Sequence, residues 1–349
     1  MEVESRLYEK LPDGSVRCLT CPHYCVIKEG HTGICGLRVN KNGKLYFKAY
    51  GMICTEAIDP IFKKPLFNFY PGADIYSVSS ISCNFKCPWC QNYTISQFPH
   101  ANEVPTYYVS PEELIARIKK YNVQHLAFTY AEPAVWFEYV YDVFKLAHEE
   151  GILNTIVTNG YWSKESLEKL KGLIDAANVD IKAFNEEVYT KYIKGRLNPV
   201  LEAVKMMYDQ GVHIELTMLI VPTVNDNLDD VRKFCKWVVN ELSPDVPVHF
   251  SRFFPHYKFL NVPPTPIEFL VKCREIACEE GLRYVYLGNV PGSYEDTICP
   301  NCGERVIGRW GFELTEWNLD DENKCKKCGY KIAVVGKFER KSRRHPFYL

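Results

Sequence analysis

The sequence predicts an α/β protein built on a partial (β/α)6 barrel. Apolar runs of about four to eight residues, typical of buried strands, alternate with segments of about ten or more residues that have helical periodicity. Glycine, proline and asparagine turn signals separate the two kinds of segment. Six strand–helix units precede a closing strand, fewer than in a full eight-fold barrel, and an open doubly wound sheet is the alternative.

Local signals justify the elements in turn. Pro111 stands at the first position of a helix that Ser110 and Glu113 open with a capping-box spacing. Gly151 and Gly211 end two later helices, because glycine readily adopts the left-handed conformation that follows a helix. We expect strands at residues 75–79, 125–129, 155–158, 178–181, 213–221, 248–251 and 283–287, and helices at residues 110–121, 135–150, 163–176, 199–210, 228–242 and 265–280.

The barrel is predicted to span residues 74–293. Residues 1–73 form a cysteine-rich N-terminal segment, residues 294–336 form short β-like pieces around two cysteine pairs, and residues 337–349 form a basic tail. The tail could bind nucleic acid or an acidic protein, but a solvated chain end is the favoured interpretation.

Composition and charge exclude several classes of protein. The chain has 46% hydrophobic and 24% charged residues and a net charge of −1, so no global field draws it to nucleic acid or to anionic lipid. Residues 1–6 contain no apolar run, and no stretch reaches the apolar length of a membrane span. We therefore expect a cytoplasmic protein that has no membrane partner and does not bind nucleic acid.

Cysteine usage points to metal binding. Eleven of the fifteen cysteines fall into three groups with short spacings, which in a reducing compartment indicates ligation of metals or clusters. Cys54 falls outside these groups. So do Cys235, Cys273 and Cys278, which lie in helix-like segments and are interpreted as core filler.

The sharpest group is Cys83-x3-Cys87-x2-Cys90, in the loop after the first barrel strand. Three thiolates can hold three irons of a [4Fe-4S] cluster and leave the fourth iron open. An open iron can bind an amine and a carboxylate, which the methionyl end of S-adenosylmethionine offers. A structural zinc site is the alternative, with His100 as a fourth ligand, but zinc sites usually present their ligands in two pairs.

This loop resembles the signature of the radical S-adenosylmethionine (radical SAM) superfamily, including the aromatic residue Trp89 before the third cysteine. The resemblance implies the partial barrel and a cofactor site after consecutive strands. It implies that Glu132 holds the amino group of S-adenosylmethionine, that Asn159 lies near the nucleoside, and that Lys182, in an Asp180-Ile181-Lys182 motif, meets the methionyl carboxylate. Taken singly, each residue also has a simpler interpretation: Glu132 as a surface acid, Asn159 as part of a turn, and Lys182 as a lysine that pairs with Asp180.

The chain is identified more finely as a member of the AmmeMemoRadiSam system radical SAM enzymes, which are related to pyruvate formate-lyase activating enzymes. The segments that carry this resemblance are Arg17 to Cys25, Cys35 to Arg38, Lys64-Pro65-Leu66, Tyr70-Pro71-Gly72 and Gly288 to Gly292. Where activating enzymes have Gly-Gly-Glu-Pro, this chain has Tyr130-Ala131-Glu132-Pro133. This departure weakens the case for a glycyl radical enzyme as the target.

Two further groups each offer four thiolates. Cys18, Cys21, Cys25 and Cys35 suit either tetrahedral zinc or an auxiliary [4Fe-4S] cluster, and the spacing does not decide between them. The alternative is four unligated cysteines. Cys299, Cys302, Cys325 and Cys328 form two Cys-x2-Cys-Gly knuckles typical of a zinc ribbon.

The expected function is reductive cleavage of S-adenosylmethionine to a 5′-deoxyadenosyl radical that abstracts hydrogen from a protein or a small molecule. The expected partners are a low-potential electron donor of the ferredoxin or flavodoxin type and a protein substrate or partner encoded nearby. Two alternatives are a radical SAM enzyme that modifies RNA and a non-catalytic metal-binding adaptor. Glu132, Asn159 and Lys182 argue against the adaptor, which needs no cofactor site.

Overall fold

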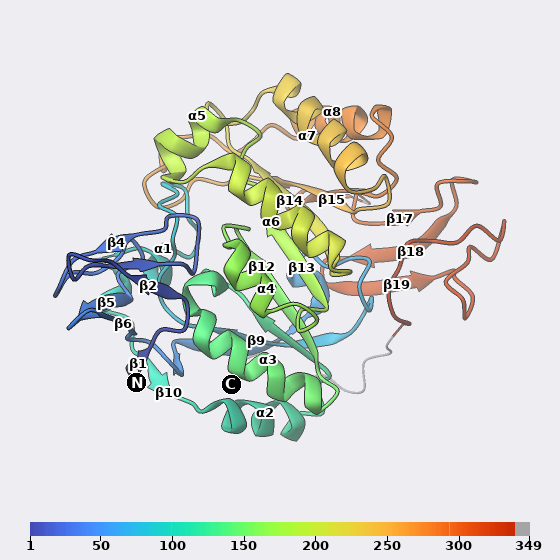
Figure 1. Cartoon of the computed structure of the whole chain (residues 1–349). Helices are drawn as coiled ribbons and strands as arrows, with labels where there is room; N and C mark the ends of the chain where they lie inside the picture. The colour runs from blue at the N-terminus through green and yellow to red at the C-terminus, as the bar shows by residue number, and fades with distance from the viewer. Residues whose placement is uncertain (99, 293, 339–349) are drawn as a thin grey trace.

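The computed structural model describes residues 1–98, 100–292 and 294–338, so the predicted basic tail lies almost entirely outside the described residues. An eight-stranded sheet with the order β16-β15-β14-β13-β12-β11-β9-β8 forms its centre (Figure 1). Seven strands run parallel, and β8 pairs antiparallel with β9. Within the described ranges β8 and β16 do not pair with each other, so the barrel is not closed. The predicted fold class is confirmed.

The parallel strands lie close to where the sequence predicts them, each with an apolar, mostly buried run. Their bounds are β9 (Asp74–Ser79), β11 (His125–Phe128), β12 (Leu153–Thr158), β13 (Ala176–Asp180), β14 (His213–Ile220), β15 (Val248–Arg252) and β16 (Val285–Gly288). Because these strands run parallel, their carboxyl ends meet at one end of the sheet. The loops that follow the strands therefore come together there.

Helices connect the strands and cover the outer face of the sheet (Figure 1). The helix α2 begins as predicted, with Ser110 Oγ accepting a hydrogen bond of 3.2 Å from the backbone N–H of Glu113. The bounds are α1 (Tyr93–Ser96), α2 (Pro111–Lys120), α3 (Phe137–Glu149), α4 (Lys164–Lys169), α5 (Glu186–Val188), α6 (Leu197–Asp209), α7 (Leu228–Glu241) and α8 (Ile267–Glu279), with shorter turns η1 (Ile61–Lys63), η2 (His100–Asn102), η3 (Pro133–Trp136) and η4 (Tyr189–Ile193).

Two details of the prediction are wrong. The helix predicted at residues 163–176 ends at Lys169, because Gly172 adopts a φ of +75°, a left-handed conformation that stops the helix before β13. Cys278 is exposed near the end of α8, on its solvent side, whereas Cys235 and Cys273 are buried as core filler.

The N-terminal segment forms small antiparallel sheets, β1-β6-β5 and β2-β3-β4, beside the barrel. The strands are β1 (Val3–Glu4), β2 (Tyr8–Lys10), β3 (Val16–Cys18), β4 (Val26–Ile27), β5 (Arg38–Lys41) and β6 (Lys44–Phe47). β7 (Met52–Ile53) pairs with β10 (Tyr107–Tyr108), and β8 (Thr55–Pro60) joins the edge of the barrel sheet. The segment is thus attached to the barrel by strand pairing.

Residues 294–336, which contain the four C-terminal cysteines, are called the ribbon below. They form the antiparallel strands β17 (Thr297–Ile298), β18 (Arg305–Trp310) and β19 (Glu313–Trp317). Its apolar side chains share one buried cluster with residues at the starts of the barrel strands, among them Ile75 and Tyr284. Arg309, only 4% exposed, donates to the backbone oxygen of Phe67 at 2.7 Å. The ribbon therefore covers the amino ends of the strands, and Figure 1 places it on the opposite side of the molecule from the N-terminal sheets.

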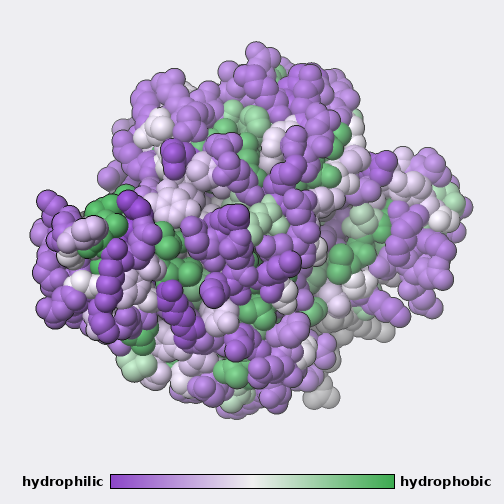
Figure 2. Space-filling view, viewed as in Figure 1, coloured by the Kyte–Doolittle hydropathy of each residue, from purple (hydrophilic) through white to green (hydrophobic). Residues whose placement is uncertain are grey.

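On the face in Figure 2 the surface is predominantly hydrophilic, with apolar side chains in small separate groups. Among the described residues, no helix combines the length and the apolar character that crossing a membrane requires.

Candidate active site

A cavity of about 310 Å³ lies at the carboxyl ends of the barrel strands. Chemistry gathers at this end of parallel β/α folds because the loops after the strands converge there. All the residues that the sequence predicts for the active site line the cavity: Cys83, Cys87, Trp89, Cys90, Glu132, Asn159, Asp180 and Lys182. The structure therefore brings together side chains that follow four consecutive strands, β9, β11, β12 and β13.

The cysteine loop lies between β9 and α1. The backbone N–H of Phe85 donates to Cys83 Sγ at 3.3 Å, and Asn159 Nδ2 lies 3.5 Å from the same sulfur. Ser96 Oγ lies 3.2 Å from Cys90 Sγ. Hydrogen-bond donors that point at a sulfur atom stabilise its thiolate form, so the loop favours cysteines that are negatively charged.

The thiols of this loop do not suit a single zinc ion. Tetrahedral zinc with Zn–S bonds of about 2.3 Å places its sulfurs about 3.8 Å apart. Across the described part of the chain, the sulfurs of Cys83, Cys87 and Cys90 do not all lie within 4.8 Å of one another. Burial raises the pKa of the Cys87 thiol to about 12, and the nearby Lys182 ammonium opposes this rise. A cluster with several irons fits this donor set better than a zinc knuckle.

Trp89 fixes the loop against the barrel. It is 3% exposed, and its ring packs against Phe259 and Tyr192 at centroid distances of 5.5 and 6.2 Å. The aromatic residue before the third cysteine thus belongs both to the cavity wall and to the packing that positions Cys90.

Glu132 is buried, and its carboxylate binds three donors of the protein. Oε1 accepts from Thr158 Oγ1 at 2.6 Å and from the N–H of Ala134 at 3.0 Å, and Oε2 accepts from the N–H of Asn159 at 2.8 Å. Burial raises the pKa of Glu132, and these hydrogen bonds oppose the rise. A carboxylate has about four acceptor positions, so one is left for a ligand in the cavity.

Lys182 and Asp180 form an ion pair in the cavity wall. Burial lowers the pKa of Lys182, but Asp180 and the nearby Cys87 outweigh this effect and raise it above its usual value, so the ammonium stays charged. Asp180 Oδ1 is buried and has no hydrogen-bond partner among the described residues. A ligand that brings a hydrogen-bond donor would satisfy this oxygen.

Sequence patterns did not indicate a group formed by Asp59 at the end of β8, Lys63 and Lys64 in the connection to β9, and Tyr130 after β11. Asp59 accepts from Lys63 Nζ at 2.7 Å, from Lys64 Nζ at 2.6 Å and from the hydroxyl of Tyr130. The Lys64 ammonium lies 4.1 Å from the Tyr130 ring centroid, and burial lowers the pKa of Lys64 to about 8. Lys63, Lys64 and Tyr130 line the cavity. The Lys64-Pro65-Leu66 segment was the only signal, and it pointed to a family without pointing to a role.

The ribbon cysteines form a compact group of four thiols that could bind a metal. Cys299 and Cys328 have their sulfurs 3.6 Å apart, and those of Cys302 and Cys325 are 3.8 Å apart. All four sulfurs lie within 4.8 Å of one another. These distances agree with a single tetrahedral metal ion. Cys18, Cys21, Cys25 and Cys35 line a second, separate cavity in the N-terminal segment.

The chain is similar to several known proteins. The family model described as "Radical SAM superfamily" matches residues 78–238. The uncharacterized protein MJ0808 of Methanocaldococcus jannaschii is 49% identical over 334 residues, 95% of this chain and 99% of that protein. The pyruvate formate-lyase-activating enzyme of Clostridium pasteurianum is 27% identical over 168 residues, 45% of this chain and 66% of that enzyme. With the cysteine loop and the parallel sheet already described, these matches establish that the chain belongs to the radical SAM superfamily.

Proposed function

We propose that this protein cleaves S-adenosylmethionine reductively at the cavity and uses the product radical to take a hydrogen atom from a protein or a small-molecule substrate. The convergence of Cys83, Cys87 and Cys90 with Glu132 and Lys182 in one cavity carries the proposal. A [4Fe-4S] cluster with bound S-adenosylmethionine supplies one-electron reduction of the sulfonium, which yields methionine and a 5′-deoxyadenosyl radical.

The protein's own residues would bind and orient the cofactor. The three cysteines hold the cluster, and the N–H and hydroxyl donors around them stabilise their negative charge. Glu132 accepts from the methionyl amino group at its free acceptor position, and the charged Lys182 meets the methionyl carboxylate. Val157 and Leu219 add apolar wall on which the adenine packs.

The substrate would enter beside the group of Asp59, Lys64 and Tyr130. The similarity to an enzyme named for activating pyruvate formate-lyase supports a protein substrate. Tyr130 stands where activating enzymes have glycine, and it narrows this side of the cavity. This departure weakens the case for a glycyl radical enzyme as the target, and we infer a ferredoxin or flavodoxin type of protein as the electron donor. We propose that the four ribbon cysteines hold structural zinc. We also propose that the chain belongs to the AmmeMemoRadiSam branch of the superfamily.

The test is anaerobic reconstitution with iron and sulfide, followed by dithionite and S-adenosylmethionine. We expect an electron paramagnetic resonance (EPR) signal of a reduced [4Fe-4S] cluster that changes when S-adenosylmethionine is added, and formation of 5′-deoxyadenosine. Incubation with proteins encoded beside the gene, read by mass spectrometry, then searches for the substrate. A reconstituted cluster that neither responds to S-adenosylmethionine nor forms 5′-deoxyadenosine would contradict the proposed function.

A further inference from the structure

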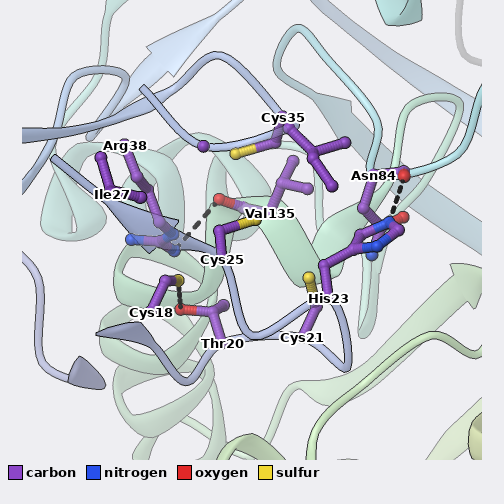
Figure 3. A pocket seen from close by; sticks show the side chains of 12 residues that line it. Cys18, Thr20, Cys21, His23, Cys25, Ile27, Cys35, Arg38, Asn84 and Val135 are labelled. Carbon is purple, nitrogen blue, oxygen red and sulfur yellow. Dashed lines mark hydrogen bonds between the residues drawn. The ribbon is translucent and has the colours of Figure 1, made fainter. Parts of the chain in front are cut away.

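A second cysteine site lies between the N-terminal sheets and the barrel. Figure 3 shows Cys18, Cys21, Cys25 and Cys35 around one enclosed space, and these four residues line the cavity. They come from the end of β3, the turn after it and the loop before β5. None of the four is in a disulfide.

The spread of these thiols differs from that of the ribbon thiols. The ribbon sulfurs all lie within 4.8 Å of one another, as a single metal ion requires. Among the described residues, no three of the N-terminal cysteines meet that limit, although all four face the same cavity. The same chain therefore contains one closed four-thiol site and one wide four-thiol site. A cluster with several irons would let thiols that are too far apart for one ion each reach its own metal atom.

The walls of the cavity suit an anionic, oxygen-sensitive occupant. Ile27 and Val135 supply apolar wall. The guanidinium of Arg38, 1% exposed, lies in the wall and donates to Glu138 Oε2 at 2.8 Å and to the backbone oxygen of Val135 at 3.2 Å. A cluster bound by four thiolates carries net negative charge, which a buried guanidinium stabilises. At Gly33 a Cβ atom would lie 3.2 Å from the side chain of Ile27, so glycine preserves the space here.

Hydrogen bonds join this site to the loop of the active site. Ser82 Oγ donates to the backbone oxygen of Cys35 at 2.6 Å, and His23 Nε2 lies 2.8 Å from the backbone oxygen of Asn84. Ser82 and Asn84 are the two neighbours of Cys83. The opposite side of the site reaches the surface, where Val26 and Ile34, beside Cys25 and Cys35, are 55% and 48% exposed. The four cysteines therefore lie between the solvent and Cys83.

We propose that Cys18, Cys21, Cys25 and Cys35 bind an iron–sulfur cluster and that this cluster passes electrons to the cluster held by Cys83, Cys87 and Cys90. In each transfer a reduced flavodoxin-type donor loses one electron, the N-terminal cluster accepts it and then gives it to the active-site cluster, and no bond is formed or broken. The binding of the cluster stands by itself, whereas the relay depends on the proposed function.

Metal analysis tests the occupant. Wild-type protein purified anaerobically and reconstituted should contain more than the four irons of one [4Fe-4S] cluster, with matching sulfide and a single zinc for the ribbon. A triple variant, Cys83→Ala/Cys87→Ala/Cys90→Ala, should keep iron and sulfide, and adding Cys18→Ala/Cys21→Ala should remove them. Two zincs per chain, or no more than four irons in the wild type, would overturn the assignment without any variant having to fold.

Rates with two reductants test the relay. Cys18→Ala/Cys21→Ala should form 5′-deoxyadenosine about ten-fold or more slowly than the wild type with reduced flavodoxin. With dithionite, a small reductant that can reach the active-site cluster directly, its rate should stay within about two-fold. Equal rates with flavodoxin, or equal losses with both reductants, would overturn the relay. A wild type that is inactive even with dithionite would count against the proposed function, and the metal analysis would still decide the occupant.

Discussion

At the scale of single residues, the proposed cluster depends most strictly on the cysteine loop, because each thiol would hold one iron and no neighbouring side chain would replace it. Cys83→Ala, Cys87→Ala and Cys90→Ala should each abolish 5′-deoxyadenosine formation. Cys278→Ala, at an exposed cysteine outside the three groups, is the matched control and should retain full activity. Cleavage by any loop variant at the wild-type rate would contradict the cluster assignment.

Lys182 and Glu132 should respond differently to substitution, although both line the cavity. Lys182→Ala removes a charge-assisted hydrogen bond worth about 1.5–3 kcal/mol, which lowers affinity for S-adenosylmethionine roughly ten- to a hundred-fold. Lys171→Ala, at an exposed lysine, is the control. Isothermal titration calorimetry on reconstituted protein gives the affinities, and unchanged binding would remove Lys182 from the cofactor site.

Glu132→Ala should also lower affinity, but it should cost stability as well. Its carboxylate accepts from Thr158, Ala134 and Asn159, and unpaired buried donors cost about 1–3 kcal/mol each. Thermal unfolding should therefore occur at a lower temperature than in the wild type, whereas Glu275→Ala, at an exposed glutamate, should unfold like the wild type. If Glu132→Ala unfolds like the wild type, these hydrogen bonds contribute less than the geometry implies.

The sequence predicted the cavity residues that follow parallel strands. Glu132, Asn159 and Lys182 each come directly after a strand, and parallel strands bring their carboxyl ends together. Asp59 and Lys64 could not be predicted in this way. Lys64 reaches the cavity, and Asp59 accepts a hydrogen bond from it, because β8 pairs with β9, a contact that depends on tertiary structure and leaves no periodic signal. Tyr130 adopts a φ of +67°, a left-handed conformation that glycine adopts more readily than tyrosine.

At the scale of elements, Glu215 on β14 connects the β8–β9 loop to two strands. Its carboxylate accepts from the N–H groups of Phe67 and Asn68 at 3.0 and 2.7 Å, and it lies 3.0 Å from His213 Nε2 and 2.7 Å from His249 Nε2. Burial raises the pKa of Glu215, but the hydrogen bonds with both histidines outweigh it and hold the pKa at about 2, below the usual 4.5.

This depressed pKa predicts how stability depends on pH. The contribution of the Glu215 carboxylate is present in full above pH 4.5 and is lost as the pH falls towards 2. Glu215→Gln should therefore be less stable than the wild type at neutral pH, by about 1–3 kcal/mol, and the difference should shrink as the pH falls below 4.5. Parallel thermal unfolding of both proteins across this range measures the difference, and a gap that is independent of pH would show that the carboxylate is not ionised in the fold.

Elements with strong local signals were predicted, and elements held by packing were not. Ser110 and Glu113 located the start of α2, and apolar runs located the parallel strands. The short N-terminal strands were not predicted, because strands of two to four residues are too short to show a recognisable alternation of apolar and polar residues. The end of α4 was misplaced because the helical pattern continued through buried Leu170 and Ile174, although Gly172 between them adopts a left-handed conformation.

At the scale of the whole molecule, the two ends of the barrel have separate tasks. The carboxyl ends of the strands hold the cavity, and the N-terminal sheets flank its cysteine loop through Ser82 and Asn84. The amino ends are covered by the ribbon, whose buried Arg309 packs over Phe62 and Phe67 at 4.9 and 4.7 Å from their ring centroids. The four ribbon cysteines thus lie at the end of the barrel opposite the cavity.

Loss of the ribbon metal should therefore weaken the fold without stopping the chemistry. Cys302→Ser/Cys328→Ser should release one zinc per chain and lower the temperature of thermal unfolding, because the ribbon loses the ion that orders it against the shared core. Iron content and 5′-deoxyadenosine formation at low temperature should remain, since the cavity lining contains no ribbon residue. Deletion of residues 294–349 is a harsher experiment: it would expose Phe62, Phe67 and Tyr286, so insolubility of that fragment would reflect the shared core and not the site. If the double variant keeps its iron and its fold yet no longer cleaves S-adenosylmethionine, the ribbon acts on the active site, and the separation of the two ends of the barrel is wrong.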